Sequence, residues 1–365
     1  MPLAARTDPA YLLVTPTTGS DADMPHPTGD RRLRIAVFGA GSIGCYLGGH
    51  LAQHADVTLI GRPSVLDGLH GGVTLSGGGR PAVHLPRQRL TLTTEPDAVA
   101  GADCVLVTVK SAATVTAGRE LAGRLRPDAV VVSFQNGLHN TRLLRDELPG
   151  VTVLAGMVPY NVARTAPDTF HQGTGGALML DGGAASAPLV AALTAAGLPV
   201  EPRDDMREVQ HAKLLMNLNN AVNALSGLPL REQLGARPYR RCLALCQEEA
   251  LAAFAAAGVR PARLGPAPAR LMPRILRLPD GLFRRVAAAG LRVDAQARSS
   301  MWDDLEQGRA TEVDGLQGEV VALAERHGLT APVNARLAAL VHEAERPGGR
   351  RSWSGPELLG ALRRA

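Results

Sequence analysis

The sequence predicts an α/β protein in which an N-terminal Rossmann-type, doubly wound sheet is followed by an all-helical C-terminal domain. Three observations support this prediction. Short apolar runs alternate with helical patterns from Arg34 to about Val200, which is typical of βαβ units around a parallel sheet. A glycine-rich turn follows the first of these runs, and helical periodicity dominates from about Asp204 onward. The length of 365 residues is sufficient for two domains.

Short apolar runs predict the strands of the sheet. Each run is rich in Val, Ile or Leu, as strands buried on both faces usually are. The main runs are Arg34–Phe38, Val57–Ile60, Cys104–Val109, Ala129–Phe134 and Val151–Ala155. Extra strands, some of them antiparallel, are expected near Val73–Leu75, Thr91–Thr93, Thr169–Gln172 and Ala177–Leu180.

The second half of the chain has the apolar periodicity of helices. The predicted helices are Lys213–Leu225, Tyr239–Ala257, Ala295–Gln307, Glu312–His327 and Pro332–Glu345, with a stretch rich in Pro and Arg, 261–279, between the second and the third. A short helix is expected at 355–362. The predicted organisation is a mobile N-terminal extension (1–30), a sheet domain (31–203), a helical domain (204–346) and a C-terminal tail (347–365).

Composition excludes several classes of protein. Hydrophobic residues make up 45% of the chain and charged residues 20%, so a wholly disordered chain is excluded. No segment predicts a membrane span or a signal peptide, and we therefore expect a cytoplasmic location. The four cysteines lack the spacing of a metal site, so no metal is expected and the thiols should lie in the core.

The chain is basic, with a net charge of +5 and a pI near 9.4. It does not predict binding to nucleic acid, because aromatic residues make up only 3% of it and no such motif is present. The basic excess is local, since 260–298 holds nine Arg against two Asp. A solvated arginine-rich face or attraction for an anionic ligand would explain it.

The turn after the first predicted strand reads Gly-Ala-Gly-Ser-Ile-Gly and fits the G-x-G-x-x-G pattern of dinucleotide-binding proteins. Gly39 permits the tight turn, Gly41 lets the backbone approach a pyrophosphate, and Gly44 lets the next helix pack on the strand. Unpaired N–H groups in the first helical turn, which includes Ser42 and Ile43, would face the phosphates. The alternative is a glycine turn in another kind of α/β protein.

Arg62 determines the predicted cofactor. Enzymes that bind NAD usually carry Asp or Glu at the end of the second strand, where the carboxylate binds the ribose hydroxyls. Here that strand end reads Thr58-Leu-Ile-Gly-Arg62, and the guanidinium is well placed for a 2′-phosphate. We therefore predict NADP (NADPH) and assign 31–203 as the NADP-binding domain. The alternative is a surface arginine, because 37 of the 39 basic residues are Arg.

The two lysines, Lys110 and Lys213, stand among 37 arginines, which hints that each performs a task that arginine cannot. Lys110 ends one predicted strand, and Asn136 lies at the end of the next. Strand ends of this kind line the ligand crevice of doubly wound sheets. Asn136 could therefore orient a nicotinamide ribose or a substrate, and a simple Asn-Gly turn is the alternative.

Lys213 begins a helical segment that is rich in asparagine. At about 100° per residue, Asn217 and Asn220 share one helix face with Lys213. Asparagine forms helices poorly, so its presence indicates another need, although a solvated polar face is the alternative. A lysine can release and regain a proton, and burial beside another cation lowers its pKa. Lys213 is thus a candidate general acid, and a carboxylate partner is expected within 299–314.

Taken together, these features resemble the 2-dehydropantoate 2-reductase (ketopantoate reductase) family of pantothenate biosynthesis. The resemblance implies hydride transfer from NADPH to the 2-keto carbon of ketopantoate. The matching motifs, in the family's order, are Gly39-Ala-Gly-Ser-Ile-Gly44, Arg62, Val107-Thr-Val-Lys110, Gln135-Asn-Gly137, Lys213-Leu-Leu-Met-Asn217, Ser299-Ser-Met301 and Thr311-Glu-Val-Asp314.

The resemblance also implies roles for single residues. Lys213 would protonate the developing alkoxide, and Glu312 would hold the substrate hydroxyl and help to position Lys213. Lys110 and Asn136 would border cofactor and substrate, and 204–346 would be the substrate and catalytic domain. The residues expected to bind substrate are Asn217, Asn220, Ser300 and Lys110, with Ser300 near the substrate carboxylate.

One departure from the family pattern leaves the substrate open. The family usually has a second substrate asparagine eight residues after the catalytic lysine, whereas this chain has Ala221 there, flanked by Asn220 and Asn223. A related NADP-dependent reductase of another 2-keto or β-hydroxy acid is therefore an alternative. A further alternative is an NADPH-binding regulatory protein without turnover. The expected partner is a small 2-keto acid, and a homodimer stays open.

Overall fold

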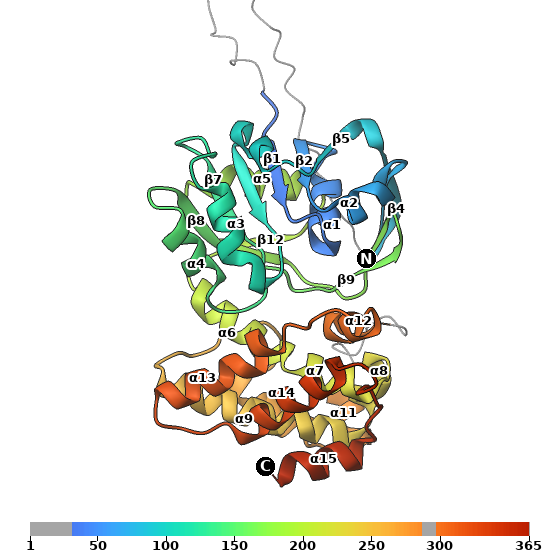
Figure 1. Ribbon diagram of the computed structural model, residues 1–365. Helices are drawn as coiled ribbons and strands as arrows, with labels where there is room; N and C mark the ends of the chain where they lie inside the picture. The colour runs from blue at the N-terminus through green and yellow to red at the C-terminus, as the bar shows by residue number, and fades with distance from the viewer. Residues whose placement is uncertain (1–30, 287–296, 365) are drawn as a thin grey trace, which may run out of the picture. The chain divides into compact units, whose positions relative to one another are not determined.

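A computed structural model describes residues 31–286 and 297–364. The predicted mobile extension, 1–30, and the start of the predicted helix 295–307 lie outside these residues. The described residues after Arg31 belong to one compact unit. Figure 1 shows its β-strands in the first half of the chain and its larger helices in the second.

The larger sheet has eight described strands in the order β12-β11-β8-β7-β6-β1-β2-β5. The six strands from β8 to β5 run parallel, while β11 runs antiparallel to β8. From β5 to β8, this is the doubly wound order 3-2-1-4-5-6 of a dinucleotide-binding sheet, so the predicted fold class is confirmed. The strands are β1 (Arg34–Phe38), β2 (Asp56–Ile60), β5 (Leu90–Thr93), β6 (Cys104–Val107), β7 (Val130–Ser133), β8 (Thr152–Met157), β11 (Leu178–Asp181) and β12 (Val200–Arg203).

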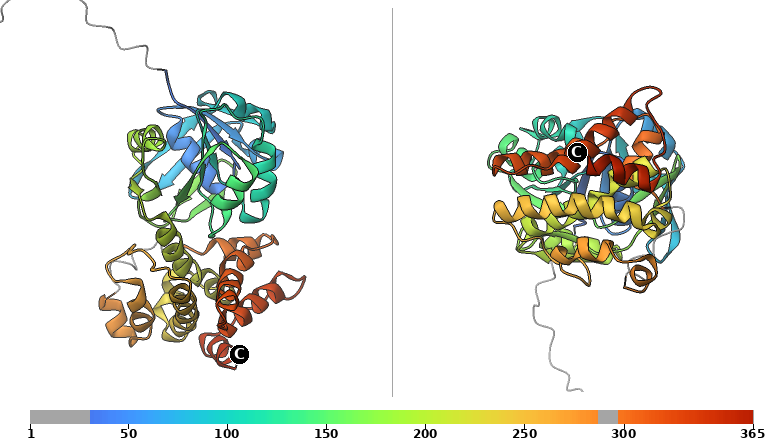
Figure 2. Two further views of the ribbon diagram at one scale, coloured as in Figure 1. Left: turned by 90° about the vertical axis from the view of Figure 1, so that its left-hand side faces the viewer. Right: turned by 90° about the horizontal axis from the view of Figure 1, so that it is seen from below.

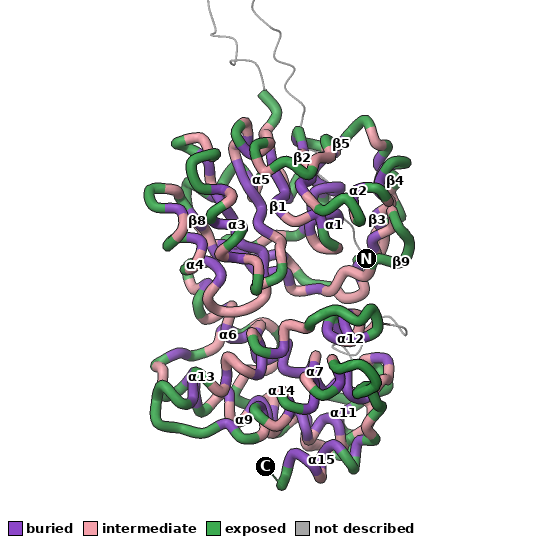
Figure 3. The backbone as a smooth tube through the Cα atoms, in the orientation of Figure 1, coloured by how far each residue is buried: buried purple, intermediate pink, exposed green. Residues whose placement is uncertain are grey.

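Helices cover both faces of this sheet, as Figures 1 and 2 show. Alternate residues of β1 enter different cores, because successive side chains of a strand point to opposite faces. Ile35 joins the core with α1 (Ser42–Leu51) and α5 (Ala187–Ala195), and Ala36 joins the core with α3 (Thr114–Leu121) and α4 (Asn140–Glu147). The strand is consequently buried along most of its length (Figure 3).

A smaller four-stranded sheet has the order β4-β3-β10-β9. Its strands are β3 (Gly72–Gly77), β4 (Arg80–Pro86), β9 (Val162–Ala166) and β10 (Thr169–Gln172). The sequence indicated β3 and β10, each of which buries apolar side chains, but not β4 and β9. The last two are largely exposed and therefore lack a clear apolar alternation.

The second half of the described chain is helical and forms its own core around the 20-residue helix α9. Helix α9 packs against α6, α7, α8, α10, α13, α14 and α15. The helices are α6 (Met206–Asn217), α7 (Asn219–Ser226), α8 (Leu230–Gly235), α9 (Arg237–Ala256), α10 (Met272–Leu276), α11 (Asp280–Val286), α12 (Ser300–Glu306), α13 (Glu319–Arg326), α14 (Pro332–Glu345) and α15 (Gly355–Arg363). Leu358 and Leu362 of α15 are buried, so the predicted tail contributes to this core.

Two predicted helices have different boundaries in the structure. The helix expected from Lys213 begins earlier, at Met206, and is divided at Leu218, whose carbonyl accepts a hydrogen bond from the Gln317 amide at 2.9 Å. The helix expected from Glu312 begins instead with a π-helical turn over Asp314–Gly318. A local break or a π-helical turn changes the direction of a helix but leaves its apolar periodicity almost unchanged, so the sequence pattern does not reveal it.

The described residues bear on two expected absences and on the position of the cysteines. None of its helices is long and apolar enough to cross a membrane. Residues 31–286 and 297–364 contain no group of three or more His, Cys, Asp or Glu side chains that could hold a metal ion. The four cysteines are free and buried, as ordinary core thiols should be.

Candidate active site

The glycine turn joins β1 to α1 at the carboxyl end of β1. Gly39 has a φ of +113°, and a Cβ there would stand 2.7 Å from the Val109 backbone nitrogen. A Cβ on Gly44 would collide with the Gly39 carbonyl oxygen and stand 2.7 Å from Thr108 Oγ1. Gly41 differs, because its Cβ would meet no atom within 4 Å. Two glycines are thus required by packing, and the third leaves backbone accessible to a ligand.

The same turn exposes the start of α1 to a ligand. Gly41 is the N-cap and is exposed, while Ser42 and Ile43 are half-buried. No side chain caps this helix end, so the first backbone N–H groups are available to a phosphate. The turn therefore fits the pyrophosphate of a dinucleotide on geometry as well as on sequence.

Arg62 follows β2, the neighbour of β1 in the sheet, and is the N-cap residue of the short helix α2 (Pro63–Leu66). Arg62 is exposed, and its guanidinium makes no hydrogen bond or ion pair within the described chain. Gly61, just before it, packs against Ala40 of the glycine turn. The guanidinium is therefore free to bind an anion beside this turn.

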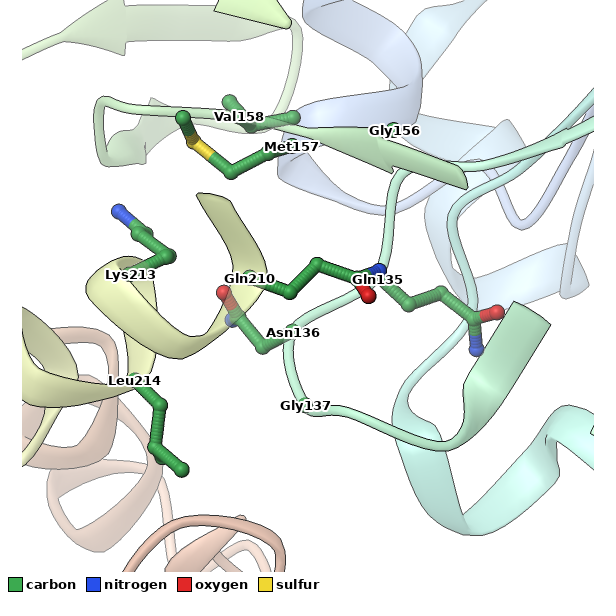
Figure 4. A pocket seen from close by; sticks show the side chains of 9 residues that line it. All are labelled: Gln135, Asn136, Gly137, Gly156, Met157, Val158, Gln210, Lys213 and Leu214. Carbon is green, nitrogen blue, oxygen red and sulfur yellow. The ribbon is translucent and has the colours of Figure 1, made fainter. Parts of the chain in front are cut away.

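A pocket lies beside the carboxyl ends of β7 and β8, and Figure 4 shows its lining. Gln135, Asn136 and Gly137 follow β7, and Gly156, Met157 and Val158 end or follow β8. Helix α6 contributes Gln210, Lys213 and Leu214 on the other side. The crevice outside the carboxyl ends of parallel strands is the usual ligand site of an open α/β sheet.

Lys213 is half-buried in this pocket, and its Nζ donates a hydrogen bond to the Pro159 carbonyl at 3.2 Å. Burial lowers the pKa of Lys213 from its usual value of 10.5 to about 8, because the charged form loses hydration. Burial alone accounts for this shift, without the neighbouring cation that was expected from the sequence. A lysine with this pKa can donate and regain a proton near neutral pH.

Asn136 connects the two halves of the site. Its Oδ1 accepts a hydrogen bond from Asn217 Nδ2 at 3.1 Å, and its own Nδ2 donates to Glu312 Oε2 at 3.4 Å. The Gly137 that follows has a φ of +102°, so the Asn-Gly pair forms a turn, and the Asn136 side chain lines the pocket. Three of the predicted residues are thus brought together by direct hydrogen bonds.

Glu312 is held by the loop that follows Lys110. Its Oε1 accepts hydrogen bonds from the Ser111 backbone N–H and from Ser111 Oγ, both at 3.1 Å. The Ser111 hydroxyl has a single proton, so it donates either to Glu312 or to the Asn136 carbonyl, which lies 2.7 Å away. Glu312 therefore contacts Ser111 and Asn136, and no hydrogen bond or ion pair joins it to Lys213 in the described chain.

Helix α14 braces the segment that carries Glu312. Glu345 accepts a hydrogen bond from the Thr311 backbone N–H at 2.8 Å, and His342 lies 2.8 Å from Glu345 and 2.9 Å from Asp314. The hydrogen bond to Glu345, and then that to Asp314, raises the pKa of His342. Residues on both sides of Glu312 are consequently anchored outside the pocket.

Lys110 reaches the helical half of the chain. Its Nζ lies 2.7 Å from Asp304 Oδ2 and donates to the Ala310 carbonyl at 3.1 Å. Asp304, whose side chain is 6% exposed, also pairs with Arg309 at 2.9 Å. Lys110 is therefore engaged with α12 and does not line the pocket of Lys213.

The remaining predicted substrate residues lie near the start of α12 and on α7. Ser300 is exposed in the first turn of α12, and Ser299 is the N-cap, whose Oγ accepts from the Trp302 N–H. Asn220 is half-buried, and its side chain makes no hydrogen bond with the described residues. Asn223 is fully buried, donates to the Leu228 carbonyl and accepts from the Ser299 N–H. Of the two asparagines, Asn220 alone is available to a ligand.

Sequence reasoning missed several residues that shape the site. Ser111 binds Glu312 and Asn136, Gln210 lines the pocket, and the Pro159 carbonyl holds Lys213. Asp304 lies within 299–314, where a carboxylate was expected, but it binds Lys110 and not Lys213. Ser111 could have been suggested by its position directly after Lys110 at a strand end. The others carry no local sequence signal, because their roles arise from contacts between distant segments.

The sheet and site define an NAD(P)-dependent oxidoreductase. A doubly wound sheet carries a glycine turn that fits a pyrophosphate, and a titratable lysine lies in a pocket at the carboxyl ends of two strands.

Comparison with known proteins identifies the family. Residues 35–182 match the family described as ketopantoate reductase PanE/ApbA, and residues 205–345 match its C-terminal domain. A 2-dehydropantoate 2-reductase of Halobacterium salinarum is 31% identical over 87% of this chain and 100% of that protein. The chain belongs to the ketopantoate reductase family and is an oxidoreductase of that family.

Solved structures agree on the fold. A ketopantoate reductase family structure from Ralstonia eutropha has a TM-score of 0.72 and 30% identity, over 86% of this chain and 98% of that one. A D-mandelate dehydrogenase with NADH and anilino(oxo)acetate has a TM-score of 0.71 at 18% identity, over 86% of this chain and 98% of that one. The second likeness is one of fold alone, and it shows that the fold serves more than one substrate.

Proposed function

We propose that this protein is a cytoplasmic, NADPH-dependent reductase that converts 2-dehydropantoate to pantoate. A hydride reaches the 2-keto carbon, Lys213 gives its proton to the oxygen, and the products are the 2-hydroxy acid and NADP⁺. The observation that carries the proposal is the pocket that a half-buried lysine, with a pKa of about 8, lines together with Asn136. Family membership supports the same reaction.

The glycine turn and Arg62 would hold the cofactor. These residues fit a dinucleotide phosphate for two reasons. Gly41 and the uncapped start of α1 offer accessible backbone, and the Arg62 guanidinium has no protein partner in the described chain. NADPH supplies the hydride when it is bound. We propose that Arg62 binds the 2′-phosphate, and that Asn136 borders both cofactor and substrate.

The helical half would bind the keto acid. We propose that Asn217, Asn220 and Ser300 bind the substrate, with Ser300 near its carboxylate, and that Glu312 holds its hydroxyl. The Ser111 and Asn136 donors keep the Glu312 carboxylate in one position. Lys213 is kept in place by the Pro159 carbonyl instead of by Glu312.

A reductase of another 2-keto acid is the second candidate. The supporting observation is Ala221, which is fully buried and stands where the family usually has a substrate asparagine. The likeness of fold to D-mandelate dehydrogenase makes a bulkier 2-keto acid worth testing. Substrate selection would then depend on Asn220.

The function is tested by measuring NADPH oxidation with ketopantoate and with a panel of other 2-keto acids. The largest kcat/KM is expected with ketopantoate. A larger value for a different 2-keto acid would replace the substrate but keep the reaction. Binding of NADPH without turnover of any acid in the panel would support a regulatory protein instead. Light scattering of the same preparation would test for a homodimer, since a ketopantoate reductase of Staphylococcus aureus with a similar fold is dimeric.

The pKa of Lys213 predicts how reduction depends on pH. The general acid acts in its protonated form, so kcat/KM for the keto acid should be constant below about pH 8 and fall about tenfold per unit above it. The reverse oxidation needs the neutral lysine and should rise through the same pH. Profiles in both directions measure this, and a reduction rate that stays flat to about pH 9.5 would contradict a lysine donor.

Arg62→Ala should reduce the preference for NADPH over NADH by about 10- to 100-fold, since a charge-assisted hydrogen bond contributes about 1.5–3 kcal/mol. The ratio of kcat/KM values for the two cofactors measures the change. Arg142→Ala is the matched control, because this exposed arginine of α4 pairs with Asp146 and is remote in sequence from the glycine turn. An unchanged ratio in Arg62→Ala would remove Arg62 from the cofactor site.

A further inference from the structure

A second pocket lies in the helical half of the chain and shares no residue with the pocket of Lys213. It is lined by Arg241, Leu245, Arg277, Leu359 and Arg363. Arg241 and Leu245 are four residues apart on α9, and Leu359 and Arg363 are four apart on α15, so each helix presents one Arg and one Leu. Arg277 directly follows α10, which also packs on α9.

The pocket has a basic lining. Its lining contains three arginines and no carboxylate, and the guanidinium of Arg237 is close by, because its Nε donates to the Arg277 carbonyl at 3.0 Å. Arg277 forms a two-pronged ion pair with Glu248. Burial, and then the charges of Arg363, Arg237 and Arg277, lower the pKa of Arg241. A bound anion reduces the repulsion between neighbouring positive charges, so such a cluster favours anion binding.

Two of these guanidiniums are not used by the fold. Arg241 and Arg363 make no hydrogen bond or ion pair with any described residue. Arg240, one position earlier, is fully buried and donates to the carbonyls of Leu234, Gly235, Leu276 and Leu278 and to Asp280. The guanidiniums of Arg241 and Arg363 are therefore available to a ligand, unlike that of Arg240.

We propose that the pocket formed by Arg241, Arg277 and Arg363 binds a small phosphate-bearing anion. Guanidinium groups match phosphate oxygens with two parallel hydrogen bonds, and Arg241 and Arg363 each have both donors available. Leu245 and Leu359 give the pocket apolar walls, which suit an ester with a short apolar group. This site also explains part of the arginine-rich segment, since Arg277 lies within 260–298.

Calorimetric titration of the full-length protein, saturated with NADPH, with inorganic pyrophosphate tests the proposal. The double variant Arg241→Gln/Arg363→Gln should bind pyrophosphate at the helical site at least tenfold more weakly than the wild type. The matched control is Arg284→Gln/Arg285→Gln on α11, which removes the same charge from exposed positions outside the pocket. Any pyrophosphate bound at the glycine turn contributes equally to both variants, so their difference isolates the pocket.

Several outcomes would overturn the proposal. Equal weakening in the two double variants would indicate diffuse attraction by surface charge, and an absence of binding in the wild type would exclude the site. Citrate binding as tight as pyrophosphate, at matched ionic strength, would exclude selectivity for phosphate. If light scattering shows that the pocket variant alone dissociates a dimer, and pyrophosphate does not bind, the pocket is an interface between two copies.

Discussion

Lys213→Ala should reduce kcat with the keto acid by about 10²- to 10⁴-fold, the usual contribution of a positioned general acid. The NADPH dissociation constant should change by less than about threefold, because the proposed cofactor contacts are made by the β1–α1 turn, Arg62 and Asn136, and none of them by Lys213. Single-turnover measurements of NADPH oxidation, together with a fluorescence titration of NADPH, separate the two quantities. Far-UV circular dichroism checks that α6 is retained.

Lys213→Arg separates proton donation from positive charge. Arginine keeps the charge and can still donate to the Pro159 carbonyl, but its pKa is above about 12, so it does not release a proton near neutral pH. We therefore expect Lys213→Arg to stay within about tenfold of Lys213→Ala. A rate near that of the wild type would show that Lys213 acts by electrostatic attraction of the carbonyl oxygen, and the mechanism would need another donor.

The features that sequence reasoning could locate are those with local signals. The first strand and the glycine turn were recognisable because apolar alternation and a fixed glycine spacing follow from strand and turn geometry. Lys213 and Asn217 are one helical turn apart, so their common face follows from helix geometry alone. Asn217 donates to Asn136, whereas Lys213 lines the same pocket and donates to the Pro159 carbonyl; the spacing did not contain either of these tertiary contacts.

The cluster of asparagines illustrates what local reasoning cannot reach. Asparagines in an apolar segment indicated a role beyond forming the helix. In the structure, the individual asparagines bind different partners. Asn219 pairs with Gln233 on α8, and Asn223 binds the loop before α12 at Ser299. These contacts join distant segments, and buried polar groups require such partners. Only the fold separates the structural asparagines from the available Asn220.

Lys110 shows the same limit for a charged residue. Its place after a strand was visible in the sequence, but the direction of a flexible side chain depends on which carboxylate the fold brings within reach. The structure provides Asp304, nearly two hundred residues away along the chain, and thereby connects the sheet half to α12. Ion pairs between distant segments have no periodic signature, so they cannot be predicted from spacing.

The three glycines of the β1–α1 turn predict two different kinds of failure. Gly41→Val should weaken NADPH binding by about 100-fold or more, equivalent to about 2.7 kcal/mol, while the midpoint of thermal unfolding stays near that of the wild type. Gly41 has a φ of −86°, which valine can adopt, and a Cβ there meets no protein atom within 4 Å. The side chain would instead occupy the surface that the pyrophosphate approaches.

Gly44→Val should instead destabilise the fold first and weaken NADPH binding only as a consequence. Its Cβ would collide with the Gly39 carbonyl oxygen and crowd Thr108 Oγ1 and Val37, so helix α1 must move away from β1. Overpacking of this kind costs about 1–3 kcal/mol or more and should lower the stability of the protein even without cofactor. Denaturant unfolding and NADPH titration of both variants measure the contrast. If Gly41→Val binds NADPH as the wild type does, the cofactor does not approach this turn, and the assignment of the glycine motif fails together with that of Arg62.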